Sequence, residues 1–146
     1  MHNIIVDLQL RLERMKMNNQ LKPQVRMKID SNHWDITLEG SSPKTGSKIL
    51  NLLPLESEVR TWGEEIYFSI PLSMPEENAK SIVALGDVAY WPEGQCFCVF
   101  FGKTPLTSTL DEIKPASPVN VFGKVLGDLE SLKTVKPNVK VLLKRV

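Results

Sequence analysis

The sequence is poor in the residues on which metal centres and nucleophilic enzymes depend. It has two cysteines and two histidines among its 146 residues. Cys96 and Cys98, two residues apart in an extended apolar stretch, suit neither a mutual disulfide nor joint metal ligation, so we expect two reduced, buried thiols. A histidine-based zinc site or a Ser-His-Asp triad would rest on His33 alone, because His2 lies beside the N-terminus and no G-x-S-x-G motif occurs. We therefore expect no metal and no cofactor.

An excess of charge of one sign is also lacking. The 18 Lys and Arg residues against 17 Asp and Glu leave a net charge of +1, without the basic surface with which nucleic-acid binders neutralise phosphates. The longest unbroken apolar run, Cys96 to Phe101, is far shorter than the ~20 residues that span a bilayer. No charged-then-apolar leader opens the sequence. These absences predict a cytoplasmic protein that binds neither nucleic acid nor membrane.

What is present is the composition of an ordinary globular domain. Hydrophobic residues make up 42% of the chain and charged residues 24%. A chain of this length corresponds to about one domain and buries roughly 68 to 70% of its unfolded surface. Such a core needs no disulfide or metal to hold it together.

Residues 1–23 differ in pattern from the rest and form an N-terminal extension. Their apolar residues recur at spacings of three, four and three, which predicts one stripe along an amphipathic helix: Ile5, Leu8, Leu12 and Met15. The polar stretch 18–23 ends in Pro23, which cannot continue a helix, and it predicts a linker.

Three interpretations of this extension stay open. The helix is an oligomerisation or docking element, which would make the protein a homo-oligomer. Alternatively, it packs loosely on its own domain or stays disordered, because a helix near 15 residues is marginal alone. In the third interpretation, Met15 or Met17 is the biological start.

From residue 24 to 146 the apolar period changes to two, which is typical of strands. Polar and apolar residues alternate on both sides of a turn at Ser31 and Asn32, which predicts a β-hairpin with one core face: Val25, Met27 and Ile29, then Trp34, Ile36 and Leu38. Further strand-like stretches are 58–62, 64–70, 87–91, 96–102, 119–125 and 139–145. A short helix is expected after the N-cap Ser42 and Pro43, and another over 128–135. About eight strands and two short helices predict a mainly β fold, a closed antiparallel barrel with helices at its ends.

Large aromatic residues gather in three blocks, each beside a glycine. The blocks are TWGEEIYF at 61–68, GDVAYWP at 86–92 and FFGKTP at 100–105. Most of these aromatics are expected in the core, because barrels fill with such side chains. Gly63, Gly86 and Gly102 would let the backbone turn or approach closely at the barrel rim, where ligand clefts form.

These blocks, together with PASPVNVFG at 115–123, resemble the signature of a small prokaryotic family of largely uncharacterised proteins with a cyclophilin-like fold. The resemblance runs from about residue 24 to the C-terminus and leaves the N-terminal extension outside. It implies an eight-stranded, closed antiparallel β-barrel with two short helices, in agreement with the strand pattern. It implies no established activity.

Cyclophilins themselves suggest an alternative function, peptidyl-prolyl cis-trans isomerisation. By that analogy the catalytic candidate is Arg60, which begins a strand pair after the first helix of the barrel. The position where a glutamine is expected is Phe68, no Gln-Gly-Gly run follows, and no histidine matches the proline pocket. Any isomerase activity is therefore expected to be weak or vestigial.

We predict instead a binding module for a small molecule or peptide. The expected cleft lies on the side of the barrel, and its walls are Trp62, Tyr67, Tyr90 and Phe101. Its polar anchors are Glu64, Glu65 or Asn120. Adjacent side chains of a strand diverge, so only one of Glu64 and Glu65 faces the cleft.

Overall fold

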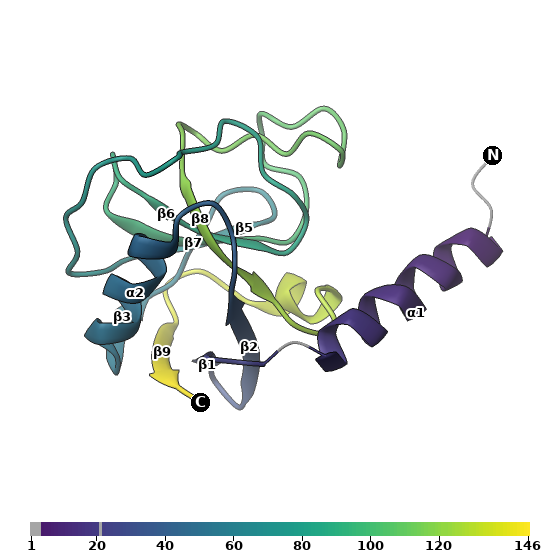
Figure 1. Ribbon diagram of the computed structural model, residues 1–146, viewed down its shortest axis with the longest axis horizontal. Helices are drawn as coiled ribbons and strands as arrows, with labels where there is room; N and C mark the ends of the chain where they lie inside the picture. The colour runs from purple at the N-terminus through teal and green to yellow at the C-terminus, as the bar shows by residue number, and fades with distance from the viewer. Residues whose placement is uncertain (1–3, 21) are drawn as a thin grey trace.

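Alternating apolar residues form the strands of a nearly closed antiparallel barrel, which the computed structural model describes over residues 4–20 and 22–146 (Figure 1). The strands are β1 (Val25–Ile29), β2 (Asn32–Leu38), β3 (Leu55–Glu58), β4 (Arg60–Thr61), β5 (Glu65–Ser69), β6 (Asp87–Trp91), β7 (Cys96–Phe100), β8 (Asn120–Val125) and β9 (Lys140–Arg145). The helices are α1 (Ile4–Gln20), α2 (Pro43–Leu52) and the 3₁₀ helix η1 (Glu130–Thr134).

The barrel closes through one short segment, residues 55–61. Its first part, β3, pairs with β9, and its second part, β4, pairs with β5. The change of partner falls at Val59, whose N–H donates to the Val139 carbonyl at 2.9 Å and whose carbonyl accepts from the Asn138 N–H at 2.8 Å. The sheet order β3-β9-β1-β2-β8-β6-β7-β5-β4 therefore begins and ends on the same segment.

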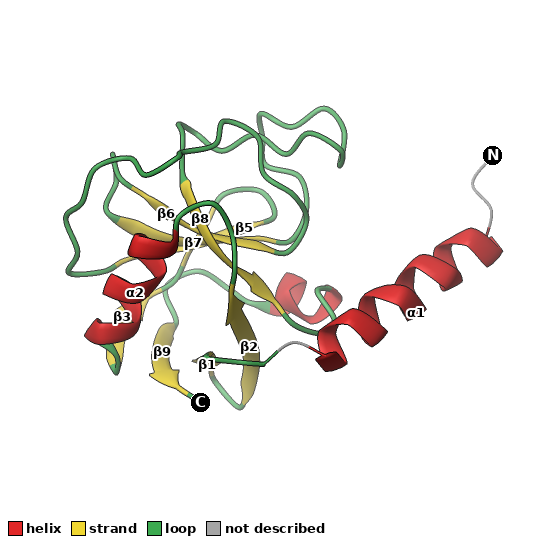
Figure 2. Cartoon of the chain, in the orientation of Figure 1, coloured by secondary structure: helices red, strands yellow, loops and turns green. Residues whose placement is uncertain are grey.

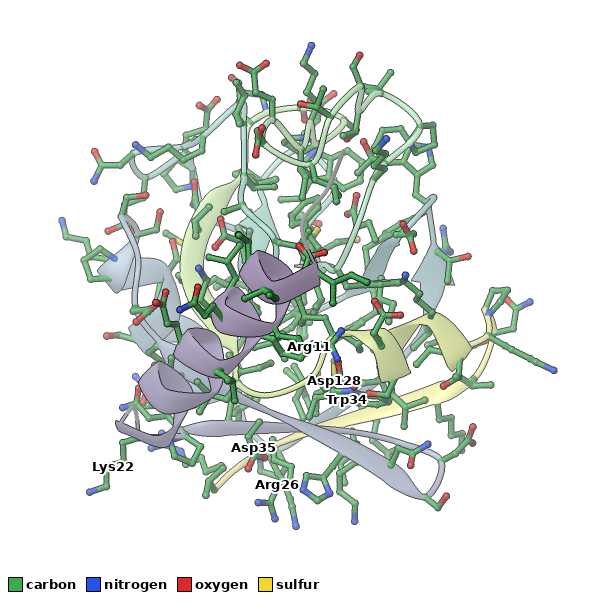
Figure 3. All side chains as sticks on the ribbon, turned by 90° about the vertical axis from the view of Figure 1, so that its right-hand side faces the viewer. Arg11, Lys22, Arg26, Trp34, Asp35 and Asp128 are labelled. Carbon is green, nitrogen blue, oxygen red and sulfur yellow. The ribbon has the colours of Figure 1, made fainter. Side chains whose placement is uncertain are left out.

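The β1–β2 hairpin turns one residue earlier than the sequence predicts. Asp30 and Ser31 form the turn, with Asp30 at φ 55°, so that Asn32 already belongs to β2. Arg26 and Asp35 lie opposite each other in register, and the guanidinium donates to both carboxylate oxygens at 2.8 and 3.1 Å (Figure 3). This pairing lowers the pKa of the Asp35 carboxyl and ties the two strands together on the polar face.

The inside of the barrel holds the larger of two apolar clusters. Phe68 stacks on Phe97, with ring centroids 4.9 Å apart, and Phe97 meets Phe122 edge to face. Leu38 is only partly buried, but the other five hairpin residues that the period-two pattern places in the core are buried there: Val25, Met27, Ile29, Trp34 and Ile36. Burial of these side chains is the main stabilising contribution to the barrel.

The second apolar cluster lies outside the barrel, on the outer face of β6, β7 and β8. Its members are Val83, Ala89, Cys96, Cys98, Phe100, Ile113, Val119 and Val121. Two of them, Ile113 and Val119, come from the irregular segment 103–119, which thus covers part of this face. Because β7 is covered on both sides, all five of its residues are buried.

The N-cap of α2 differs from the expectation. Pro43 is the first helical residue, as predicted, but the Ser42 hydroxyl makes no cap bond and donates instead to the Glu77 carbonyl at 2.5 Å. The Glu77 carboxylate accepts from the N–H groups of Lys44 and Thr45 at 3.0 and 2.9 Å. A residue 35 positions away therefore caps this helix, which local sequence could not indicate.

Helix α1 projects away from the barrel (Figure 2). Three side chains of the predicted stripe are more than half exposed: Ile5, Leu8 and Leu12. The Met15 side chain lies outside the described part of the chain. Within residues 4–20 and 22–146, no helix combines the length and the apolar character that crossing a bilayer requires.

Candidate functional site

A tight hairpin between β4 and β5 fixes the first side chains of the site. The backbones of Trp62 and Glu65 exchange both hydrogen bonds, at 3.0 and 3.2 Å, so Gly63 and Glu64 form a two-residue turn. Gly63 has φ 60°, the conformation that the first position of a type II′ turn requires and that glycine adopts without strain. The turn therefore sends the neighbouring carboxylates of Glu64 and Glu65 in different directions.

A pocket of about 230 Å³ opens on the outer face of the barrel, beside the second apolar cluster. Its floor comes from β5, β6 and β7, and its far wall comes from the covering segment after Lys114. The lining residues are Trp62, Glu65, Tyr67, Trp91, Cys98, Pro115, Ala116 and Val119. Three of these were predicted as site residues from one sequence block: Trp62, Glu65 and Tyr67.

Two aromatic rings of the pocket stand at right angles. Tyr67 and Trp91 have ring centroids 6.4 Å apart and an interplanar angle of 86°. The Trp91 indole N–H donates to the Ser117 hydroxyl at 2.5 Å, which links the floor of the pocket to the covering segment. Trp62, Tyr67 and Trp91 form the aromatic walls of the pocket, and each of the three residues is half-buried.

Glu65 places a carboxyl group in this apolar setting. Glu65 is only 6% exposed. This burial raises the pKa of the Glu65 carboxyl to about 7, and a hydrogen bond with the Cys98 thiol partly offsets the increase. The Cys98 pKa is raised well above its ordinary value, chiefly by burial, so that thiol stays protonated. Within the described residues no lysine or arginine forms an ion pair with Glu65. The carboxyl therefore changes its charge near neutral pH.

Glu64 lies outside the pocket. Its carboxylate is 3.6 Å from the Lys133 ammonium and accepts weakly from the Lys103 N–H at 3.4 Å. Its side chain packs against Gly102, where a Cβ atom would collide with the carboxyl group. Gly102 thus allows the hairpin tip to approach the strand end that follows β7.

Three expected site residues lie elsewhere, and the cleft predicted from sequence is corrected accordingly. Tyr90 and Phe101 belong to the inner cluster, and the Tyr90 hydroxyl donates to the Leu72 carbonyl at 2.6 Å. Asn120 is fully buried: its amide donates to the Thr45 hydroxyl and the Pro75 carbonyl, and its oxygen accepts from the Glu77 N–H. These contacts hold the loop before β6 in place and leave none of the three in the pocket.

Arg60 is exposed on β4 and lies directly opposite Tyr67 in the β4–β5 register, so it stands beside the aromatic pocket without lining it. It belongs to a shallow polar depression with Glu56, Ser57, Glu58, Ser69 and Lys140. In the part of the chain that the structure describes, no group of histidine, cysteine or carboxylate side chains is arranged to hold a metal ion.

Sequence reasoning missed the other half of the pocket. Trp91 stands in one of the aromatic blocks, but no feature of the sequence assigns it to a cleft, and the sequence predicts Cys98 only as a buried thiol. Residues 115–119 approach the sheet through tertiary packing alone. Part of the pocket could have been found from the two-residue period of strands, which places Glu65 and Tyr67 on one face of β5. Tyr67 pairs in register with Cys98, which therefore lies on the same face.

Among solved structures, the chain is similar to the hypothetical protein AF2241 from Archaeoglobus fulgidus. The two share 39% identity over 86% of this chain and 96% of that one, with a TM-score of 0.73. A structure of McbB in complex with tryptophan matches with a TM-score of 0.63 and 14% identity. That match covers 84% of this chain but less than half of McbB, 44%, and it shows the fold alone.

Curated proteins provide no significant sequence match. The model of the Cyclophilin-like family matches residues 23–144, almost the whole chain apart from the N-terminal extension. The family expected from the four sequence blocks is confirmed, and the chain belongs to the Cyclophilin-like family.

Proposed function

We propose that this chain binds a small organic molecule in the pocket on the outer face of β5, β6 and β7. The observation that carries the proposal is the combination in one cavity of aromatic sides with a buried carboxyl that has no cation partner among the described residues. Ligand pockets are mostly apolar, with a few polar groups that fix orientation. At about 230 Å³ the pocket accommodates a small molecule or a single side chain of a peptide.

A fragment screen followed by affinity measurements tests this proposal. Tyr67→Ala removes one aromatic wall and is expected to weaken binding of a screening hit by tenfold or more. Glu64→Gln is the matched control, because Glu64 is the chain neighbour of Glu65 and lies outside the pocket. If the hits shift only NMR resonances of residues outside the pocket, or if Tyr67→Ala leaves their affinity unchanged, the proposal fails.

Isomerase activity is the alternative, and we propose that it is weak or vestigial. Its candidate Arg60 is exposed and lies opposite Tyr67, but it lines the polar depression and not the aromatic pocket that could hold a proline ring. Stabilising a twisted X-Pro amide against a barrier of about 18–20 kcal/mol requires a cation and a proline pocket in one place. Because Arg60 lines the neighbouring depression and not the pocket itself, we expect no efficient catalysis.

We also propose that α1 associates with α1 of a second copy. Leu8 and Leu12 are 51% and 54% exposed, and with Ile5 they follow the spacings of three and four that form a coiled-coil seam. Comparing the native mass of the full chain with that of residues 23–146 tests this role. A concentration-dependent dimer that disappears on truncation supports it, and identical monomeric masses contradict it.

A further inference from the structure

The shape of the pocket narrows the chemical class of its ligand. Trp62, Tyr67 and Trp91 surround one small cavity, and the Tyr67 and Trp91 rings are perpendicular. The face of an aromatic ring carries negative charge density and attracts cations, and sites that recognise quaternary ammonium groups are built from several such rings. A neutral apolar ligand would gain only burial from the same walls.

The surroundings of Glu65 also favour a positively charged ligand. From β7 the groups that interact with Glu65 are the thiols of Cys98 and Cys96, and on β5 its neighbour on the same face is Tyr67. The cation on the adjacent strand is Arg60, which lies opposite Tyr67 and, among the described residues, forms no ion pair with Glu65. The part of the covering segment that lines the pocket, PASPV at 115–119, contains no charged residue. A buried carboxylate without a cation is costly unless a ligand supplies the positive charge.

We propose that the ligand is an organic cation, whose ammonium group lies between the rings of Trp62, Tyr67 and Trp91 and forms an ion pair with the Glu65 carboxylate. This inference rests on the proposed function and specifies its ligand. Aromatic faces and a carboxylate act together, because both favour positive charge and the surrounding apolar surface strengthens the attraction.

Binding of such a cation is linked to the loss of a proton from Glu65. With a pKa of about 7, the free carboxyl is mostly protonated at pH 6 and mostly ionised at pH 8. Only the ionised form pairs with the cation, so the apparent affinity should rise about tenfold from pH 6 to pH 8. A permanently charged ligand is the right probe, because its own charge does not titrate.

Choline and its uncharged isostere 3,3-dimethylbutan-1-ol form a matched pair of probes. We expect the full chain to bind choline at least tenfold more tightly than the isostere at pH 8, as measured by calorimetry. Binding of choline at pH 6 should release close to one proton, seen as a dependence of the heat on the buffer. Glu65→Gln should abolish both the preference for choline over the isostere and the pH dependence of choline affinity, whereas Glu64→Gln should preserve both. Thermal melts check that each variant is folded.

The outcomes separate this inference from the proposed function. If fragments bind in the pocket but choline does not, or if choline and its isostere bind equally and Glu65→Gln changes neither, the cation assignment is overturned while a small-molecule pocket stands. If neither probe binds and no fragment perturbs Trp62, Tyr67 or Trp91, both proposals fail.

Discussion

The two faces of the β5–β7–β6 sheet differ sharply although the same strands form them. On the inner face, Phe68, Phe97 and Tyr90 lie in one row across the three strands. On the outer face, the adjacent row is Tyr67, Cys98 and Ala89. The inner row is completely buried, whereas Tyr67 remains half-buried beside the pocket.

The difference comes from what covers each face. Strands and helices close around the inner row and pack side chain against side chain, as interiors normally do. The outer row meets the irregular segment 103–119, which contributes Ile113 and Val119 to the second cluster but leaves space between Trp62, Trp91 and Pro115. The core and the proposed binding pocket are therefore lined by alternate residues of the same strands.

The largest expected effect distinguishes the two rows by stability. Phe68→Ala removes a buried ring and should lower the free energy of unfolding by roughly 3–5 kcal/mol. Tyr67→Ala, on the same strand but on the outer face, should cost clearly less, because its side chain is only partly buried and borders a pocket. Chemical denaturation measures both, and equal losses would contradict the assignment of the two faces.

The pH dependence of stability tests the burial of Glu65. Its pKa is raised in the folded state to about 7, so the folded chain binds more protons than the unfolded chain between about pH 4.5 and 7. This group therefore favours folding at low pH and loses that contribution as the pH rises, by about 3 kcal/mol over the window. Glu65→Gln should remove this decline from denaturation curves, and Glu64→Gln should keep it. A decline that persists in Glu65→Gln would mean that another group causes it.

Asn120 is expected to be a structural residue, with an intermediate effect. Asn120→Ala leaves the Glu77 N–H and the Pro75 carbonyl without their buried partner and should cost about 1–3 kcal/mol. Ligand affinity should not change in the folded variant, because Asn120 does not line the pocket. A loss of affinity at unchanged stability would return Asn120 to the binding site.

Removing residues 1–22 should have little effect on the barrel. The side chains of α1 described here are exposed, and the family match begins at residue 23. The truncated chain should keep a cooperative thermal transition and a mainly β circular dichroism spectrum. Aggregation or loss of cooperativity would show that Ile5, Leu8 and Leu12 belong to the core.

The smallest expected effect concerns Arg60. A protease-coupled assay on a proline tetrapeptide should give little turnover, and Arg60→Ala should leave that rate unchanged. Turnover at the level of ordinary cyclophilins that vanishes in Arg60→Ala would move the functional site from the outer pocket to β4.

The sequence predicts the fold better than the site, for a physical reason. In a strand with one solvent-exposed face, such as β1, polar and apolar residues alternate along the sequence and reveal the strand. The sequence also predicts β6 at its observed bounds, Asp87–Trp91. In β7 and in the middle of β6 both faces are buried, so no alternation there or at the end of β7 shows which residues face outward. For that reason Tyr90 and Phe101 were expected beside Tyr67, although they belong to the inner cluster.

Long-range packing accounts for the remaining gaps. The change of partner at Val59 and the cap that Glu77 provides for α2 depend on contacts between distant segments. Trp62, Glu65 and Tyr67 were predicted together because a single hairpin carries them. The covering segment reaches the pocket only through tertiary structure, and local sequence contains no signal for it.

The three indole N–H resonances of the chain test the central claim most directly. Trp62 and Trp91 line the outer pocket, whereas Trp34 is buried on β2 and donates to the Ser131 hydroxyl at 2.9 Å (Figure 3). Titration of the ¹⁵N-labelled chain with choline at pH 8 should shift the resonances of Trp62 and Trp91 with one common Kd and leave that of Trp34 in place. Saturable shifts confined to Trp34, or no shift of any indole at millimolar choline, would contradict the account.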